Sequence, residues 1–453
     1  MSAIRSLAEF ITRVTPPVEA RRRAAVAFLD TVGVMLAGAV EPAAKAVQHV
    51  AKAAGAGESQ IFGTTVRTTG AAAALANGTA AHALDYDDMC FVSLAHPSAP
   101  LVPAVLAAAE LEGASGRAAL DAYVVGFEIE CVVGRRMQPR HYQRGWHPTS
   151  TLGTLGAAAA AGRVLGLDPG KAAHALAIAA SEASGLKENF GTMIKPLHAG
   201  LAAQNGVTAA RLAEAGLTGS ELALDGPQGF LTALDGEHRD LGDAASILGT
   251  RWEILETGIT VKLYPSCAGT HPALDALLLL RRRERYTAAD VESIDIDVDR
   301  IAPTILIHDR PSSGLEGKFS MPFCAAAATV HGRVGIETFE PELLNDRDVR
   351  ALMSRVTMRV DPGFDGAAPP LTQSRVTVRL RDGRCFVETA NGARGYPDNP
   401  ASDEELTAKF RSCARKVLSD DQTEHALSLL KSIEELDDVR DLTRGLAGRE
   451  ALR

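Results

Sequence analysis

The stretch Ser150-Thr-Leu-Gly-Thr-Leu-Gly-Ala-Ala-Ala-Ala-Ala-Gly-Arg-Val-Leu165 decides the fold class of the larger part of this chain. Its apolar residues recur with helical spacing, and the face expected to be buried consists mainly of alanine and glycine. Small residues let helix axes approach closely, so the stretch predicts a tightly packed, all-helical domain. Gly153 and Gly156 resemble a phosphate-binding loop only superficially, because no Gly-Lys-Ser/Thr ending follows them, and we interpret them as packing glycines.

The same helical spacing extends from the N-terminus to about residue 250. It predicts helices over residues 21–36, 71–84, 102–111, 117–136, 150–165, 171–183 and 199–215. The sequence Leu167-Asp-Pro-Gly170 places Asp and Pro at the start of a helix, where both residues are favoured. This part of the chain is therefore expected to be all-helical.

The pattern changes near residue 290. Residues 293–299 and 356–360 alternate apolar and polar side chains, which predicts half-buried strands, and 376–389 reads as a hairpin with an Asp-Gly turn. A helix is expected between these strands, over residues 319–331. Polar amphipathic helices follow at 402–418, with Ser402 as the expected N-cap, and at 423–436.

Composition and charge exclude several classes of protein. Of the 453 residues, 46% are hydrophobic and 23% charged, which is typical of a globular chain and not of a disordered one. The net charge of -9 disfavours a nucleic-acid partner and a polybasic membrane anchor. Six cysteines without a CxxC pair indicate reduced thiols and no zinc or iron–sulfur site. Without a signal-peptide pattern or a long apolar run, we expect a soluble cytoplasmic protein.

Acidic residues follow the helix predicted over residues 71–84. Asp85, Asp87 and Asp88 lie close together, and His96-Pro97 comes shortly after them. Carboxylates that crowd together repel, so one of them can hold a proton near neutral pH, which suits acid–base chemistry. The alternative is a solvated helix C-terminus followed by a loop.

Histidine and lysine precede proline at the starts of two other predicted helices. Pro148 favours an extended His147 near a helix N-terminus, where the imidazole tends to stay neutral and an anion can bind. Lys195 would lie at the mouth of a helix that begins at Pro196, which suits a carboxylate ligand. The alternatives are an incidental capping histidine, a surface lysine and a packed His198.

A further polar segment runs from Lys262 to Asp275, at the junction of the two predicted domains, where ligand pockets commonly form. His271 and Asp275 could share a helix face, but with no third ligand they are more consistent with a structural pair than with a metal site. Cys267 beside His271 could act as a nucleophile, although no feature marks its pKa as lowered.

Together these segments supply carboxylates, histidines and lysines without a metal or cofactor motif, a combination that suits a small polycarboxylate. Cationic side chains would bind its carboxylates and stabilise the enolate-like charge that develops when a proton next to a carboxylate is removed. An acid–base pair would move that proton.

Several motifs resemble the MmgE/PrpD family in order and spacing, over about residues 5 to 445. They are His82-Ala-Leu-Asp-Tyr-Asp-Asp88, His96-Pro-Ser-Ala-Pro100, His147-Pro-Thr-Ser-Thr-Leu-Gly-Thr-Leu-Gly-Ala157, Lys195-Pro-Leu-His-Ala-Gly200, Lys262-Leu-Tyr-Pro-Ser-Cys-Ala-Gly-Thr-His-Pro272 and Gly317-Lys-Phe-Ser-Met-Pro-Phe-Cys-Ala325. The family includes 2-methylcitrate dehydratase, cis-aconitate decarboxylase and iminodisuccinate epimerase.

The resemblance implies a mainly α protein. A large all-helical domain would be formed by residues 1–265 with 400–453, and a smaller α+β lid domain by residues 266–399. The resemblance also implies a homodimer and cofactor-free, metal-free chemistry in a cleft between the domains.

By matching motif positions, the resemblance implies the catalytic residues Asp85, His96, His147, Lys195 and Lys262. His96 or His147 would carry the proton to or from carbon, Asp85 would orient it, and the two lysines would hold substrate carboxylates. The resemblance further suggests substrate-binding roles for His198, Cys267 and Lys318.

The resemblance predicts a dehydratase-type lyase, similar to 2-methylcitrate dehydratase, that acts on a small di- or tricarboxylate. The alternatives are an epimerase similar to iminodisuccinate epimerase, a cis-aconitate decarboxylase, and a catalytically silent carboxylate-binding protein. Met89 stands where the decarboxylase pattern has Thr, and the loop from Asp85 to His96 is one residue longer than in that enzyme. Cys267 stands where both the decarboxylase and 2-methylcitrate dehydratase carry His, and the Tyr-Pro-Ser-Cys form is more similar to the epimerase. These departures count against the decarboxylase.

Overall fold

The computed structural model describes residues 2–234, 240–241, 246–366 and 372–448, and the chain divides into two compact units. The first unit comprises Met1–Ile259 with Ser402–Arg453, and the second comprises Thr260–Ala401. Helices account for 59% of the structure and strands for 10%, so the predicted mainly α fold class is confirmed. Because the second unit begins at Thr260 and not at the expected residue 266, it includes Lys262.

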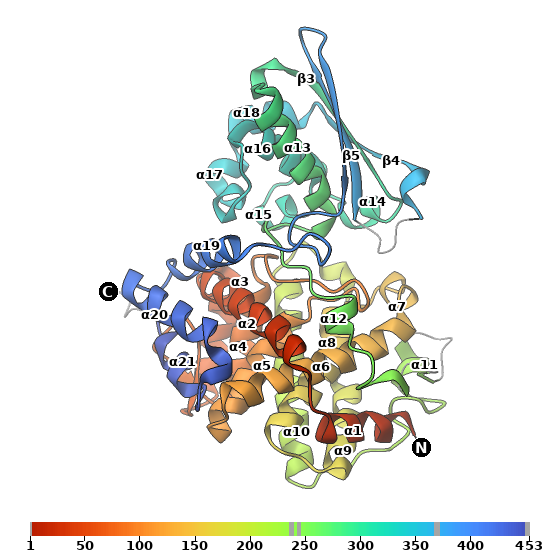
Figure 1. Cartoon of the computed structure of the whole chain (residues 1–453), viewed down its shortest axis with the longest axis vertical. Coiled ribbons are helices and arrows are strands. Elements are labelled where there is room, and N and C mark those ends of the chain that lie inside the picture. The colour runs from red at the N-terminus through yellow and green to blue at the C-terminus, as the bar shows by residue number, and fades with distance from the viewer. Residues whose placement is uncertain (1, 235–239, 242–245, 367–371, 449–453) are drawn as a thin grey trace. The chain divides into compact units, whose positions relative to one another are not determined.

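The first unit is a bundle of helices, coloured red to yellow-green in Figure 1, to which the blue C-terminal helices return. Its helices are α1 (Ala3–Arg13), α2 (Val18–Gly38), α3 (Pro42–Ala53), α4 (Gly70–His82), α5 (Ser98–Glu112), α6 (Gly116–Met137), α7 (Arg140–Gln143), α8 (Pro148–Val164), α9 (Pro169–Glu182), α10 (Ile194–Glu214), α11 (Phe230–Leu234), α12 (Glu253–Glu256), α19 (Asp403–Ala414), α20 (Asp420–Lys431) and α21 (Arg440–Gly445), with a two-strand sheet of β1 (Ser59–Gln60) and β2 (Arg67–Thr68). The expected helices in this unit are confirmed, with ends that differ by a few residues. Helices α1 and α3 and the shorter helices α7, α11, α12 and α21 were not predicted.

Glycines set the spacing of the central helices, as the opening stretch predicts. A Cβ atom added to Gly156 of α8 would lie 2.9 Å from the carbonyl oxygen of Gly126 in α6. In the same way, a Cβ on Gly206 of α10 would lie 2.4 Å from the Cβ of Ala157 in α8. No side chain fits at such distances, so α6, α8 and α10 pack backbone to backbone.

Local capping confirms two predicted helix starts. The side chain of Asp168 accepts hydrogen bonds from the backbone N–H groups of Gly170 and Lys171 at the start of α9. Ser402 forms a capping box with Glu405 at the start of α19. The chain therefore re-enters the first unit through a well-defined helix start.

The second unit contains a four-stranded sheet in the order β4-β3-β5-β6, with helices α13, α16 and α18 beside the sheet in Figure 1. Its elements are α13 (His271–Glu284), β3 (Val291–Val298), α14 (Ala302–Ile305), α15 (Gly314–Gly317), α16 (Met321–His331), α17 (Pro341–Leu344), α18 (Arg347–Met353), β4 (Val356–Val360), β5 (Gln373–Leu380) and β6 (Cys385–Asn391). The predicted hairpin is the antiparallel pair β5–β6, whose turn residue Gly383 has a φ of 91°. The alternating Ile294, Ile296 and Val298 of β3 are buried, as their spacing indicates.

Within the described residues, no individual helix has the length and apolar character needed to cross a bilayer. Helices α2 and α3 pass that test only as a pair, and the chain bends by 89° where they meet.

Close packing between α8 and α10 generates a first prediction. Replacement of Gly206 by Ala forces the new methyl group into Ala157, so we expect a loss of about 1–3 kcal/mol in the free energy of unfolding. Gly445→Ala is the matched control, because its added Cβ meets only a His425 ring carbon at 3.6 Å. Urea unfolding of both variants checks this, and equal stabilities would contradict the packing.

Candidate active site

A buried cluster of histidine, aspartate and lysine side chains lies in the first unit, where α4, α8 and α10 pack together. The sequence-predicted residues Asp85, His96, His147, Lys195 and His198 all belong to it, linked to one another directly or through His82 and Asp87. Asp85 and His96 lie in the loop between α4 and α5, and His147 lies at the start of α8. Lys195 and His198 lie in the first two turns of α10. The fold therefore collects five of the eight predicted site residues.

Lys195 connects the elements of this cluster. It lies in the first turn of α10, which begins two residues before the expected Pro196, and it is buried. Its ammonium donates hydrogen bonds to Asp85 Oδ1 at 2.6 Å and to His82 Nε2 at 2.8 Å. Because it donates to Nε2, the proton of a neutral His82 must lie on Nδ1.

Asp85 reaches Lys195 through an unusual backbone conformation. Directly after α4, Asp85 has a φ of 51°, in the left-handed region that Asp tolerates better than most residues. The chain turns back there, and both Asp85 and Asp87 are buried. The solvated-loop alternative for this segment is therefore wrong.

Asp87 links two histidines. It accepts a hydrogen bond from His82 Nδ1 at 2.8 Å, and its Oδ2 lies 3.2 Å from His96 Nδ1. Burial alone would raise the pKa of Asp87, but the interactions with His82 and His96 outweigh it and hold that pKa well below its ordinary value. Asp87 is thus an anion that fixes both rings.

Burial keeps His82 uncharged. It lowers the pKa of this imidazole to about 3, and the Lys195 and His96 charges act in the same direction, while Asp87 opposes them. A neutral His82 therefore bridges the Lys195 cation and the Asp87 anion.

His96 is the histidine of this group with the most solvent contact, at 13% side-chain exposure. Its Nε2 lies 3.9 Å from Asp85 Oδ1, and its backbone N–H donates to Thr149 Oγ1 in α8. Its ring packs edge-on against His82 at 4.6 Å. A partly accessible imidazole between two aspartates is well placed to exchange a proton with a ligand.

Asp88 behaves differently from its neighbour. It accepts hydrogen bonds from the Ser98 N–H and hydroxyl, and Ser98 in turn contacts the Tyr123 hydroxyl. Burial raises the pKa of Asp88 well above its ordinary value, more than Ser98 lowers it. The proton that the crowded carboxylates were predicted to hold therefore falls on Asp88, at the back of the cluster.

The His147 and His198 rings contact each other within the same cluster. His147 is the extended N-cap residue of α8, as Pro148 predicts, and its Nδ1 lies 3.0 Å from His198 Nδ1. Burial, and then the Lys195 charge, lowers the pKa of His147 well below its ordinary value and that of His198 to about 4. Both rings are therefore neutral at pH 7.

The C-terminal segment that returns to the first unit contacts the loop that carries the aspartates of the cluster. Lys409 of α19 pairs with buried Asp30 of α2 at 2.6 Å and donates to the Tyr86 carbonyl at 2.8 Å. Its ammonium also lies 3.9 Å from the centre of the Tyr86 ring. Lys409 thus anchors the loop between Asp85 and Asp87 to the bundle.

Four side chains of the cluster could also serve as metal ligands. One donor atom from each of His82, Asp85, Asp87 and His96 lies within 4.8 Å of the others. However, the Lys195 ammonium already contacts two of these residues, Asp85 and His82. A divalent cation bound there would have to coexist with, or displace, that positive charge.

The remaining predicted residues lie in the second unit. Lys262 and Lys318 are both buried, and Lys318 donates to the Pro265 carbonyl at 3.0 Å. The backbone N–H of Cys267 donates to the Lys318 carbonyl, also at 3.0 Å. These residues form a second group, in which two lysines lie near the turn at Pro265.

The sequence favours a structural role over metal binding for His271 and Asp275, and their hydrogen bonds agree with a structural role. His271 Nε2 donates to the Ser266 carbonyl at 3.1 Å. Asp275 accepts hydrogen bonds from the Tyr264 hydroxyl and the Arg394 N–H. Both side chains hold the turn before α13.

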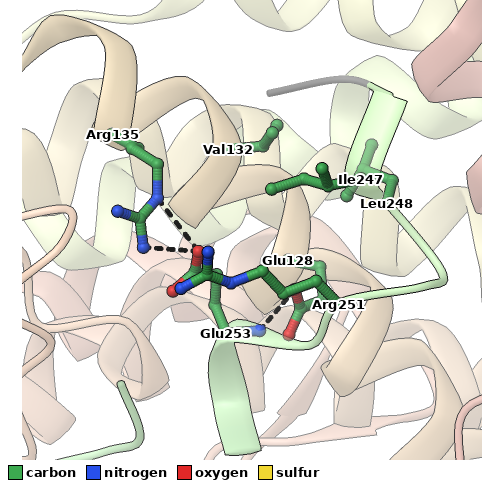
Figure 2. A pocket seen from close by; sticks show the side chains of 7 residues that line it. All are labelled: Glu128, Val132, Arg135, Ile247, Leu248, Arg251 and Glu253. Atoms are coloured by element: carbon green, nitrogen blue, oxygen red, sulfur yellow. Dashed lines mark hydrogen bonds and ion pairs between the residues drawn. The ribbon is translucent and has the colours of Figure 1, made fainter. Parts of the chain in front are cut away.

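A small pocket elsewhere in the first unit contains none of the predicted site residues (Figure 2). Glu128 accepts hydrogen bonds from the N–H groups of Glu253 and Ile254, and Arg135 pairs with Glu253. Its charged side chains therefore hold α12 against α6, which indicates a structural role.

His82 and Asp87 lie in the motif His82-Ala-Leu-Asp-Tyr-Asp-Asp88, but neither was predicted as a site residue. The available signal was spacing: His82, Asp85 and Asp87 follow a helix end closely enough to converge if the chain turns back. That turn depends on the left-handed Asp85, which no residue type in the segment demands.

The comparisons with known proteins agree with this fold. Residues 5–240 match the MmgE/PrpD N-terminal domain, and residues 264–435 match the MmgE/PrpD C-terminal domain. The cis-aconitate decarboxylase of Mus musculus is 31% identical over 392 residues, which cover 83% of this chain and 78% of the relative. The Homo sapiens decarboxylase is also 31% identical, over 83% of this chain and 79% of its own. The cis-aconitate decarboxylase-like protein oryM of Aspergillus oryzae is 29% identical over 98% of this chain and 96% of its own.

The family match and the named relatives define this protein as an enzyme, whose helical unit buries the histidine, aspartate and lysine cluster and is joined to a separate α+β unit. The chain belongs to the MmgE/PrpD family, as the motifs indicated. Its named relatives are decarboxylases and thus lyases.

Adjacent Asp87 and Asp88 give a matched pair for a second prediction. Asp88→Asn should change the free energy of unfolding by less than about 1 kcal/mol, because an amide, like a protonated acid, keeps the oxygen that accepts from the Ser98 N–H and can donate to the Ser98 hydroxyl oxygen. Asp87→Asn should cost about 1.5–3 kcal/mol, because it removes an anion that is hydrogen-bonded to His82. Urea unfolding measures both, and a costlier Asp88→Asn would show that the charges are assigned to the wrong residues.

The lowered pKa of His198 generates a pH prediction. The unfolded chain takes up a proton on His198 near pH 6.5 and the folded chain only near pH 4, so acid favours unfolding within this window. Between about pH 7 and about pH 5 the wild type should therefore lose about 1–2 kcal/mol more stability than His198→Asn. His174→Asn, a change outside the cluster, is the control and should follow the wild type. Parallel curves for the wild type and His198→Asn would contradict a neutral buried His198.

Proposed function

We propose that this enzyme is a cofactor-independent lyase that acts on a tricarboxylate, and that cis-aconitate is the first substrate to test. The observation that carries the proposal is the Lys195 ammonium held between Asp85 and neutral His82, with further histidines beside it. The named relatives, which are cis-aconitate decarboxylases, support the substrate.

Decarboxylation of cis-aconitate requires one proton per turnover. When the bond to the departing CO2 breaks, its electron pair spreads into a neighbouring carboxylate as an enolate-like anion, and a proton must then be added at carbon. A nearby cation stabilises that anion, and a neutral imidazole can deliver the proton. The cluster holds the cation, Lys195, and candidate proton donors in His96 and His147.

Lys195 also suits the binding of a substrate carboxylate. An ammonium group has three N–H donors, and the structure directs one at Asp85 and one at His82. A substrate carboxylate would exchange for one of these contacts, and Asp85 would then be released toward His96, 3.9 Å away. This links substrate binding to the orientation of the proton donor.

A second candidate is a dehydratase that acts on a hydroxylated tricarboxylate, as the sequence favoured. It is supported by Met89, which departs from the decarboxylase pattern. The same cluster would remove a proton next to a carboxylate while hydroxide leaves from the adjacent carbon. Binding of substrate carboxylates by Lys262 and Lys318, and the homodimer, stay predictions.

Proton NMR of the purified protein with cis-aconitate, citrate, 2-methylcitrate and iminodisuccinate tests the proposal. Itaconate formed from cis-aconitate, in the presence of a chelator, is the expected result. A new alkene from 2-methylcitrate or citrate would establish the dehydratase instead. Hydrogen exchange on iminodisuccinate with an unchanged skeleton would indicate an epimerase, and no change with any acid in folded protein would contradict the proposal.

Lys195→Ala should lower turnover by at least about 10²-fold, because it removes the cation that stabilises the developing anion. Lys171→Ala, at the start of α9, is the matched control and should retain wild-type turnover. Circular dichroism confirms that both variants fold. Equal turnover in the two variants would place the chemistry outside this cluster.

A further inference from the structure

Two buried imidazoles face each other across α8 and α10. His147 Nδ1 lies 3.0 Å from His198 Nδ1, the rings are tilted by 55°, and neither residue is more than 4% exposed. The Ser150 hydroxyl donates to the His198 carbonyl at 3.2 Å, so the backbones that carry the two rings are tied together. The contact is therefore held by the packing of both helices.

This contact requires opposite tautomers. A neutral imidazole has one N–H donor and one bare acceptor nitrogen, so two Nδ1 atoms at hydrogen-bond distance must share a single proton. The ring that donates has a bare, basic Nε2, whereas the ring that accepts has its own proton on Nε2. The pair therefore has a base at one end and an acid at the other.

We propose that His198 is the proton-relay partner of His147. When a proton adds to the bare Nε2 of one ring, the shared proton crosses from that ring's Nδ1 to the other Nδ1, and the second ring releases its Nε2 proton. One N–H bond forms at the entry, one is exchanged in the middle and one breaks at the exit, so neither ring keeps a charge. A proton that passes in the opposite direction restores the first tautomers.

The surroundings of the pair favour such a neutral relay. The Lys195 charge and burial both disfavour an imidazolium on either ring. The Phe190 ring packs edge-on against the His147 ring at a centroid distance of 4.9 Å, and the His82 ring stacks against the His147 ring at 5.7 Å, so His147 is confined. A neutral His147 that gives one proton to a substrate must therefore receive another from a partner, because its buried ring neither holds a positive charge nor moves to solvent. This role of His198 differs from the substrate-binding role that the family resemblance implied, and it rests on the proposed proton transfer.

The tautomers can be measured without substrate. Long-range proton–nitrogen NMR of histidine-labelled protein near neutral pH should show one of these residues as the Nδ1–H form and the other as the Nε2–H form. The signals are assigned by their loss in His147→Asn and His198→Asn. Two Nε2–H forms, or an imidazolium on either ring, would overturn the proposal whatever the enzyme's substrate.

Turnover separates a relay from a positioning role. In His198→Asn the amide can still hydrogen-bond to His147 Nδ1, but it cannot take up and release a proton, so we expect kcat to fall by about 10²–10⁴-fold with little change in KM. His174→Asn should retain wild-type turnover. If His198→Asn keeps kcat within about threefold, His198 only orients His147 and the relay is excluded. If wild-type protein turns over no tricarboxylate, the proposed function fails, while the tautomer measurement still decides the pairing on which the relay depends.

Discussion

The site depends on one buried ammonium group. The positive charge of Lys195 must be compensated inside the first unit, because an isolated buried charge would be strongly unfavourable. Its partners are Asp85, which turns back after α4, and His82, which ends that helix. The close approach of α4 and α10 that brings them together is possible because Gly78 and Gly200 meet without side chains. The alanine- and glycine-rich helices are thus the condition under which this ion pair can exist.

The charges around Lys195 are separated by burial and hydrogen bonding. Asp87 is anionic because it lies between the His82 and His96 rings, whereas neighbouring Asp88 is hydrogen-bonded to the N–H and hydroxyl of Ser98, is raised in pKa by burial and keeps its proton. His82, His147 and His198 stay neutral because burial and the lysine charge both lower their pKa values. Neutral imidazoles next to a fixed cation are suited to proton transfer at carbon, since each can donate or accept without a large change in the charge of the site.

Much of this structure was predictable, and the parts that were not share a cause. The helices around Gly156, the cap at Asp168 and the β5–β6 hairpin follow from local pattern, and the structure confirms them. Five site residues were predicted because histidine or lysine before proline, and clustered aspartates, are local signals too. The roles of His82 and Asp87 were missed because they arise from tertiary contacts between the end of α4, the loop after it and α10. The tautomers of His147 and His198 likewise depend on one distance between two helices.

The same reasoning explains why Lys409 could not be placed from sequence. It lies in a polar amphipathic helix that follows the second unit, and its partners Asp30 and Tyr86 are several hundred residues earlier in the chain. Only the return of the C-terminal segment to the first unit reveals that Lys409 supports the loop of Asp85.

In the proposed function, solvent-exchangeable histidine protons are delivered to a substrate carbon. Its most direct test is the deuterium content of itaconate formed from cis-aconitate in D2O, measured by mass spectrometry and NMR. We expect one carbon-bound deuterium per molecule, at a single position. Itaconate without carbon-bound deuterium would show that the proton comes from within the substrate, and would contradict the role assigned to this cluster.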